Sequence, residues 1–250
     1  MIDTHCHLID PQFQNDIDSV IKRAKESGVG IIINIGYDLK TSQMAIEMNK
    51  KYTWLLPAVG IHPNETALQS LEKFFELEKL LEETSVVAIG ETGLDYYRDF
   101  SPKDAQQKLF RSHIAIARRY QLPLIIHTRN SIDDAIRILK EEGYFQGVFH
   151  CYSGTIEQAK KIIEIGFYLG FGGVLTFSKK VREVFRHLPL KHIVFETDAP
   201  FLAPAGHRGR RNEPSYIFET LQVAAGILGM RVNELEEIAD RNAKRLFRIK

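Results

Sequence analysis

The sequence predicts an α/β protein, a single (β/α)8 barrel of the TIM type that spans residues 1–250. Three observations support this fold. The length of 250 residues is typical of one such barrel. Eight short apolar runs alternate with amphipathic segments, and residues that bind metals or do acid–base chemistry stand at or just after the ends of several runs. We therefore expect the active site at the C-terminal ends of the strands.

The predicted strands are rich in Val, Ile, Leu and Phe and are bounded by Gly, Pro or Asn. Runs that are apolar throughout, without alternation, are typical of strands buried on both faces of a parallel sheet. One such run alone could equally be part of a buried helix, but the regular spacing argues against this for the set. The runs cover residues 1–7, 30–36, 54–60, 86–91, 122–127, 146–151, 167–172 and 192–197.

Helical patterns fill the intervals between the strands. The clearest cover residues 16–27, 66–83, 103–120 and 131–142, and two further helices separated near Gly229 lie between about 213 and 247. Strands that alternate with helices imply a parallel sheet. Eight strands with their helical segments favour closure of that sheet into a barrel.

Composition limits the classes of function. A net charge of +1 excludes a broadly basic surface, so a polyanion would have to bind a local patch. Residues 207–211 (His-Arg-Gly-Arg-Arg) form either such a patch or ordinary solvated charge.

There is no apolar run of about 18 residues, so we expect no membrane association, and no obligate protein partner is evident. The N-terminus lacks a signal-peptide pattern, which favours a cytoplasmic location. Cys6 and Cys151 are expected to pack between strand and helix.

Six residues form the candidate metal site. His5 and His7 form a His-x-His pair, whose side chains point to the same side of a strand. Taken singly, each residue has a structural alternative: a histidine satisfied in the core, a buried Glu paired with Arg, or an Asp that caps a helix. Together they are hard to explain structurally, because they converge on the catalytic end of a barrel. The predicted metal ligands are His5, His7, Glu91, His127, His150 and Asp198.

Mixed imidazole and carboxylate ligands suit Zn²⁺, Mn²⁺, Fe or Co, and Mg²⁺ less readily. Six ligands from several strands indicate two divalent metal ions that polarise a substrate and lower the pKa of bound water. We interpret Glu91 as the carboxylate that bridges the two ions. Asp198 is placed to accept the proton of the water as general base, which makes Glu91 and Asp198 the predicted catalytic residues.

Several long motifs resemble the TatD-like metal-dependent deoxyribonucleases, within the amidohydrolase-type barrels. The resemblance runs from the first strand to the final helices. One departure is Arg241 before Asn242-Ala243, where relatives often have an acidic residue or Thr. The matching segments are residues 3–8 (Asp-Thr-His-Cys-His-Leu), 60–63 (Gly-Ile-His-Pro), 90–97 (Gly-Glu-Thr-Gly-Leu-Asp-Tyr-Tyr), 127–129 (His-Thr-Arg), 150–154 (His-Cys-Tyr-Ser-Gly), 196–202 (Glu-Thr-Asp-Ala-Pro-Phe-Leu) and 211–214 (Arg-Asn-Glu-Pro).

This resemblance implies divalent metals, here Zn, Mg or Mn, and the hydrolysis of DNA phosphodiesters. It carries the ligand roles onto the six residues named above. It also suggests that His62 and Arg129 bind the scissile phosphate, and it adds Arg211 and Asn212 as substrate-binding candidates. The expected partner is DNA, either single-stranded or damaged, cleaved in a 3′–5′ exonuclease manner.

Two other functions remain open on the sequence. The same metals could hydrolyse an amide, lactone or ester, including an aminoacyl ester of tRNA. A protein that only binds metal or nucleic acid is a third class, although six ligands shared by two ions leave open positions for water and substrate. Tyr96, Tyr97 and Tyr152 either stack on unpaired bases or pack against the protein.

Overall fold

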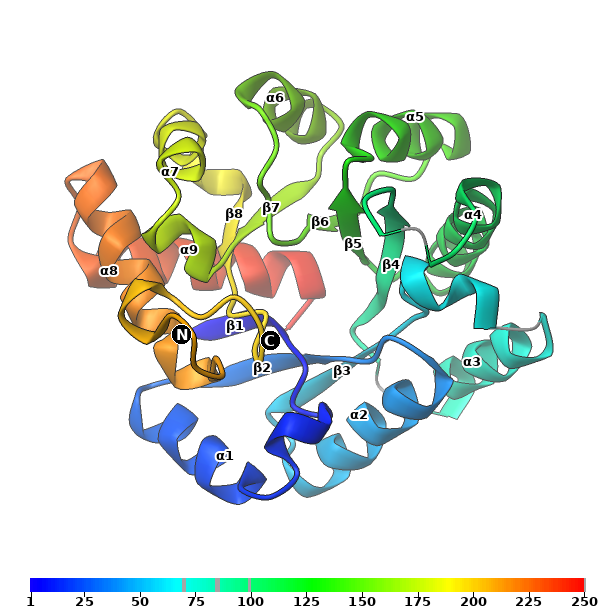
Figure 1. Cartoon of the computed structure of the whole chain (residues 1–250), viewed down its shortest axis with the longest axis horizontal. Helices are drawn as coiled ribbons and strands as arrows, with labels where there is room; N and C mark the ends of the chain where they lie inside the picture. Colours follow the sequence, from blue (N-terminus) through cyan, green and yellow to red (C-terminus); the bar gives the residue numbers. More distant parts are fainter. Residues whose placement is uncertain (69–70, 84–85, 99, 250) are drawn as a thin grey trace.

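The computed structural model describes residues 1–68, 71–83, 86–98 and 100–249, and it confirms the predicted barrel. Eight parallel strands follow one another in chain order, each paired with the next (Figure 1). A parallel bridge between Cys6 and Ala199 joins the last strand segment to the first. The strands are β1 (Ile2–Cys6), β2 (Ile31–Ile35), β3 (Leu55–Val59), β4 (Ala88–Asp95), β5 (Leu124–Arg129), β6 (Gly147–Phe149), β7 (Tyr168–Phe171) and β8 (Ile193–Phe195).

Helices surround the strands as an outer layer (Figure 1). In the described part of the chain, none of them is long and apolar enough to cross a membrane. The helix predicted over 66–83 is observed as a 3₁₀ helix, Pro63–Leu68, followed by α3; residues 69–70 lie outside the described residues. The helices are α1 (Ile17–Glu26), α2 (Leu39–Lys51), α3 (Leu71–Glu83), α4 (Lys103–Tyr120), α5 (Ile132–Glu142), α6 (Ile156–Glu164), α7 (Lys179–Arg186), α8 (Ile217–Leu228) and α9 (Val232–Phe247).

Two strands extend further than the sequence predicts. β4 continues past Glu91 to Asp95, and β5 continues past His127 to Arg129, because residues 92–95 of β4 stay paired with residues 126–129 of β5. Gly93 permits this pairing, since a Cβ at its positive φ of 129° would overlap the carbonyl oxygen of His127. The two candidate ligands, Glu91 and His127, therefore lie within their strands and not at the strand ends.

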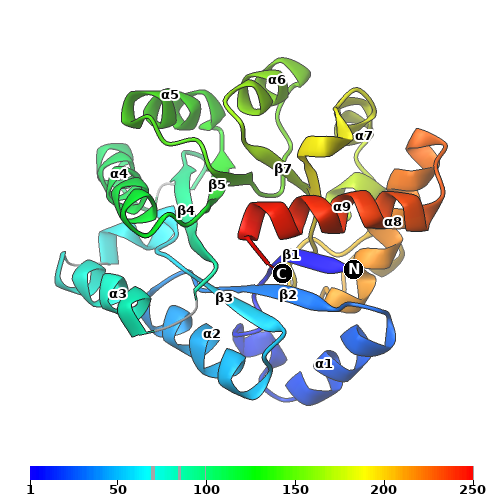
Figure 2. The same ribbon diagram turned by 180° about the vertical axis from the view of Figure 1, so that it is seen from behind.

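The inside of the barrel is an apolar core that α9 closes from below. Side chains from the strands, such as Ile33, Ile125 and Val194, pack with Leu246 and Phe247 of α9 in one buried cluster. Figure 2 shows α9 crossing the base of the barrel, opposite to the ends that carry the candidate ligands. Apolar side chains and α9 fill this end of the barrel, and the candidate ligands lie at the opposite end.

Candidate metal centre

His5 lies in β1 and His7 follows directly after it, and their imidazoles point at one another in the mouth of the barrel. Their Nε2 atoms lie 3.1 Å apart. The Nδ1 of His7 is 2.9 Å from the carbonyl oxygen of Ile35, to which it donates, so in the neutral ring the lone pair of Nε2 faces the centre. Two nitrogens on one tetrahedral ion, each about 2.0–2.1 Å from it, are separated by about 3.3 Å. The spacing of His5 and His7 fits one ion.

Asp198 joins this pair from the segment after β8. Its Oδ1 lies 3.7 Å from Nε2 of His5 and 3.6 Å from Nε2 of His7. The backbone N–H of Asp198 donates to the carbonyl oxygen of His5, and a left-handed φ of 56°, which Asp tolerates better than most residues, turns the chain there. The buried Asp3 holds the two strands together, since its carboxylate accepts from the backbone N–H and the hydroxyl of Thr197.

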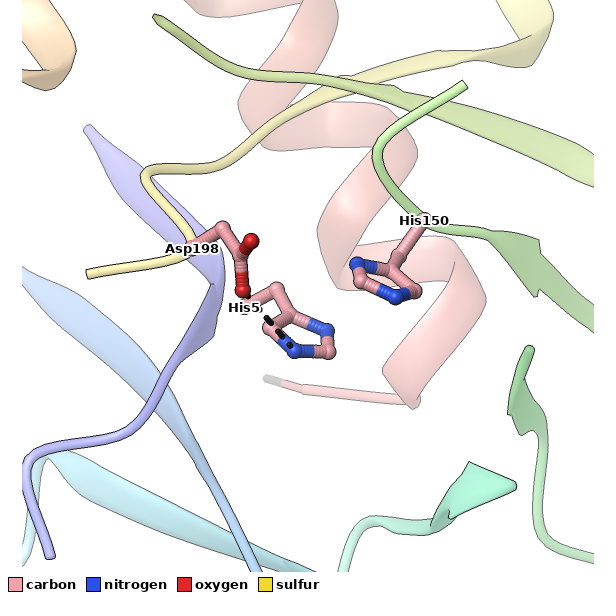
Figure 3. A group of neighbouring side chains, drawn as sticks. All are labelled: His5, His150 and Asp198. Carbon is pink, nitrogen blue, oxygen red and sulfur yellow. Dashed lines mark ion pairs between the residues drawn. The ribbon is translucent and has the colours of Figure 1, made fainter. Parts of the chain in front are cut away.

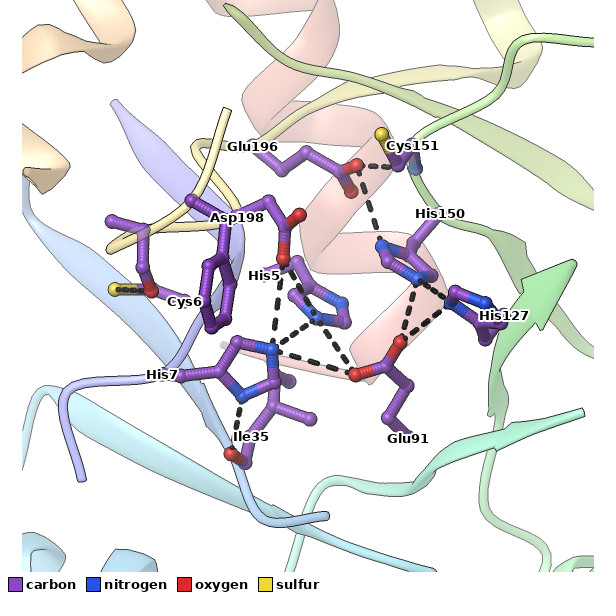
Figure 4. Close-up of polar contacts among 12 residues, drawn as sticks. His5, Cys6, His7, Ile35, Glu91, His127, His150, Cys151, Glu196 and Asp198 are labelled. Carbon is purple, nitrogen blue, oxygen red and sulfur yellow. Dashed lines mark hydrogen bonds and ion pairs between the residues drawn. The ribbon is translucent and has the colours of Figure 1, made fainter. Parts of the chain in front are cut away.

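Glu91 lies between two groups of histidines (Figure 4). Its Oε2 is 3.6 Å from Nε2 of His5 and 3.4 Å from Nε2 of His7. Its Oε1 is 3.0 Å from Nδ1 of His127 and 2.8 Å from Nε2 of His150. A side chain only 6% exposed that offers one oxygen to each group is suited to bridging two cations.

His150 also contacts the first group. Its ring stacks on that of His5, with the ring centroids 4.0 Å apart and the planes 10° from parallel. Figure 3 shows both imidazoles beside the carboxylate of Asp198. The structure thus brings all six predicted ligands into one cluster.

The electrostatics of the cluster also favour cations. Burial opposes charge on His7, yet Asp198 and Glu91 raise its pKa to about 10. In the same way burial is outweighed at His127, where Asp95 and Glu91 raise the pKa to about 9. Against the effect of burial, the surrounding histidines hold the pKa of Glu91 well below its usual range. In the absence of metal, the buried carboxylates therefore favour protonated histidines. Divalent cations could replace this positive charge at the same positions.

Two acidic residues without a predicted role stand behind the histidines. Oδ2 of Asp95 lies 3.4 Å from Nε2 of His127, and Oε1 of Glu196 lies 3.8 Å from Nδ1 of His150. A carboxylate at the distance of Asp95 orients a ligating imidazole and raises its basicity, whereas Glu196 stands slightly beyond hydrogen-bond distance of His150. The sequence carried a signal for Glu196, because it is a charged residue directly after β8 and two positions before Asp198. The signal for Asp95 was its place at the end of residues 90–95 (Gly-Glu-Thr-Gly-Leu-Asp).

His62 is placed differently from the six ligands. Its Nδ1 accepts a hydrogen bond from the backbone N–H of Asn64, at 3.0 Å, so in the neutral ring the proton resides on Nε2. That Nε2 lies 3.5 Å from Oε1 of Glu91. Burial lowers the pKa of His62 to about 3. The residue offers a neutral N–H donor to the centre, and it also holds the loop after β3.

A cavity of about 810 Å³ opens above the centre and provides room for a substrate. Arg129 lines its wall and stacks on the exposed ring of Tyr97, 3.8 Å from the ring centroid. Phe100 and Phe201 are exposed at its rim. Tyr152, by contrast, is buried in the core and its hydroxyl donates to the carbonyl oxygen of Thr155.

Arg211 and Asn212 are not among the residues that line this cavity. Arg211 donates to Asp16 and Glu213, and its guanidinium covers the ring of Phe13. The side-chain amide of Asn212 donates to the carbonyl oxygens of Thr197 and Phe201 and so fixes the segment around Asp198. Both residues therefore brace the loops around the site in this structure.

A closed parallel barrel with this cluster at its strand ends is the architecture of a metal-dependent hydrolase. A family model described as TatD related DNase matches residues 2–248. The chain therefore belongs to the TatD family of hydrolases.

Individual relatives match over nearly their whole length. An uncharacterized metal-dependent hydrolase of Bacillus subtilis, YabD, is 42% identical, covering 100% of this chain and 99% of the relative. A Klebsiella pneumoniae protein named 3′-5′ ssDNA/RNA exonuclease TatD is 31% identical, covering 100% and 98%. The crystal structure of YjjV, a TatD homolog from Escherichia coli K12, matches with a TM-score of 0.96 at 32% identity, covering 100% of this chain and 98% of that one.

Proposed function

We propose that this hydrolase is a deoxyribonuclease that uses two divalent cations to cleave phosphodiester bonds in single-stranded or damaged DNA. One observation carries the proposal: Glu91 offers one oxygen to His5 and His7 and the other to His127 and His150. The polarity of cleavage, from the 3′ end, is supported by the name of the Klebsiella relative.

The residues divide the chemistry among themselves. Bound cations would polarise the phosphodiester and acidify the attacking water. Despite its burial, Asp198 has a pKa below its usual range because of His7 and the other histidines, so its carboxylate is ionised at neutral pH and accepts the proton of that water. The Nε2–H of His62 and the planar guanidinium of Arg129 donate to the phosphate oxygens and hold the ester over the centre.

The test is hydrolysis of single-stranded and duplex oligonucleotides by protein that has been stripped with chelator and reloaded with Zn²⁺, Mn²⁺ or Mg²⁺. We expect metal-dependent cleavage of the single strand, and a loss of about 10²–10⁴-fold in kcat for Asp198→Asn. The end from which label is released gives the polarity.

The proposal is wrong if the reloaded protein cleaves no oligonucleotide, or if Asp198→Asn retains full activity. A panel of ester and amide substrates, including an aminoacyl-tRNA, run beside the oligonucleotides would reveal the alternative. If the protein hydrolyses only those substrates, the metal centre acts on an ester or amide bond and not on a phosphodiester.

A further inference from the structure

A second cavity of about 510 Å³ lies beside the metal centre. Its wall includes the end of β5, the loop after β6 and the first turn of α5. Thr128, Arg129 and Ser153 line both this cavity and the one above the metal centre. The two are therefore neighbouring parts of one groove, and Arg129 stands where they meet.

The second cavity carries cations that lack acidic partners. Within the described residues, no carboxylate lies within the 4.0 Å ion-pair distance of Lys103, Arg129 or Lys180, which all line it. Lys103 instead places its Nζ 4.6 Å from the ring centroid of Tyr96, and Lys180 donates to the carbonyl oxygen of Ser153 at 3.0 Å. These three positive charges are available to a ligand.

Two aspartates also line the cavity, but cations outside it compensate them. Asp133 accepts a hydrogen bond from Gln158 at 2.7 Å and forms an ion pair with Lys161 at 3.6 Å. Asp134 lies 3.1 Å from the guanidinium of Arg137. The net charge of the side chains that line the cavity is therefore positive.

The N-terminus of α5 adds to this positive character. Ser131 occupies the N-cap position, but its side chain makes no capping hydrogen bond to the helix. Its hydroxyl donates instead to the carbonyl oxygen of Leu94 at 2.6 Å and accepts from the backbone N–H of Arg129. The first N–H groups of α5 therefore lack a side-chain cap, and such groups attract anions.

We propose that this cavity binds the phosphate of the nucleotide that flanks the cleaved one, so that a single strand runs from the metal centre past Arg129 to Lys103 and Lys180. The inference rests on the proposed nuclease function and adds a second phosphate subsite to it. A volume of about 510 Å³ is within the range of pockets that hold a small organic ligand, and a nucleotide is of that size.

The experiment compares a double variant, Lys103→Gln with Lys180→Gln, with a control of equal charge, Lys50→Gln with Lys108→Gln. All four lysines are exposed, so we expect each variant to fold, which thermal unfolding will verify. Lys50 and Lys108 pair with acidic residues of their own helices, and neither lines the groove. The substrates are an oligothymidylate of about ten nucleotides, and bis(p-nitrophenyl) phosphate, which has one phosphodiester and no flanking phosphate.

For the groove variant, we expect the ratio of kcat/KM for the oligonucleotide to that for the small ester to fall at least about fivefold. The slope of log kcat/KM against log salt for the oligonucleotide should become shallower by about 0.7, because the contact with one phosphate is lost. The control should keep the ratio and slope of the wild type. An equal loss in both variants, or a proportional loss on both substrates, would overturn the subsite.

A binding measurement separates failure of the subsite from failure of the nuclease proposal. Fluorescence anisotropy of a labelled oligothymidylate with chelator-treated protein reports binding without hydrolysis. If the wild type cleaves no oligonucleotide but binds it more tightly than the groove variant does, the subsite stands and the nuclease proposal fails. If wild type, groove variant and control bind alike, the subsite is wrong whatever the activity.

Discussion

Oε1 of Glu91 lies 2.8 Å from Nε2 of His150, while the other oxygen of the same carboxylate faces His5 and His7. One side chain in the middle of β4 therefore contacts ligands from three other strands. A bridging role depends on the negative charge shared by the two oxygens, and an amide of the same shape lacks it.

Glu91→Gln tests this role. We expect two divalent ions per chain in the wild type and one or fewer in the variant, and a fall in kcat of about 10²-fold or more, because two ions in such a site act together. The measurement is elemental analysis of metal per chain after dialysis, followed by activity on an oligonucleotide. Glu47→Gln, which alters an exposed residue on α2, serves as control. Two tightly held ions in Glu91→Gln would show that the bridge is not needed.

The second prediction concerns pH. Asp198 and Glu91 raise the pKa of His7 to about 10 despite burial, and Asp95 and Glu91 raise that of His127 to about 9. Both imidazoles are therefore protonated at neutral pH in the metal-free protein and must lose their protons to bind a cation. Metal affinity should rise with pH until the pH exceeds these pKa values, and binding near pH 7 should release at least about two protons per chain, one each from His7 and His127.

Titration calorimetry with Zn²⁺ in buffers that differ in ionisation enthalpy measures those protons directly. Asp95→Asn provides a matched comparison, because it removes the partner that raises the pKa of His127 but leaves His7 untouched. This variant should release fewer protons. A wild-type affinity that is the same between about pH 6 and pH 8 would contradict the prediction.

The fold and the convergence of the ligands followed from local features of the sequence. Strands buried on both faces are apolar throughout, and a buried His or Asp at the end of such a run stands out against it. The length of β4 did not follow, because it depends on the pairing that Gly93 permits with His127.

The sequence also does not predict which charged side chains contact each other when the two residues are far apart in the chain. Arg211 belongs to a basic loop that suggested DNA binding, yet its guanidinium is held by Asp16, nearly two hundred residues away. Glu196 belongs to a recognisable motif, but nothing in that motif points to its neighbour His150, which follows β6. Sequence periodicity reports which face a residue occupies, and it does not report which residue of another strand lies opposite.

Arg211→Met distinguishes the two interpretations of that residue. Its ion pairs with Asp16 and Glu213 join the loop after β8 to the segment before α1, so we expect the free energy of unfolding to fall by about 1 kcal/mol, an amount limited by partial exposure of the pairs. Urea denaturation measures this loss. A substrate-binding role predicts instead a large rise in KM for an oligonucleotide with unchanged stability, and that result would contradict the bracing role.

The last prediction concerns Glu196, whose carboxyl is buried and whose pKa burial raises from its ordinary 4.5 to about 8. Between these two values the folded metal-free protein keeps a proton that the unfolded chain releases. The stability associated with this proton is complete below about pH 4.5 and is lost as pH rises through 8. The slope cannot exceed about 1.4 kcal/mol per pH unit.

Glu196→Gln removes this titration and keeps an oxygen that can accept from the backbone N–H of Cys151. With chelator present, the variant should gain stability relative to the wild type as pH rises from about 5 to 8, and the gain should level off above pH 8. Urea unfolding at a series of pH values measures the difference, and Glu47→Gln should show no such trend.

Glutamine at position 196 should stabilise the metal-free protein at high pH, but it should weaken the binding of metal. An ion on Nε2 of His150 makes its Nδ1–H a stronger donor toward the Glu196 carboxylate, so the wild type should bind metal about 10–100-fold more tightly than the variant. A competitive chelator titration reads this ratio. Equal affinities, together with parallel pH curves for unfolding, would mean that Glu196 neither carries the buried proton nor supports His150.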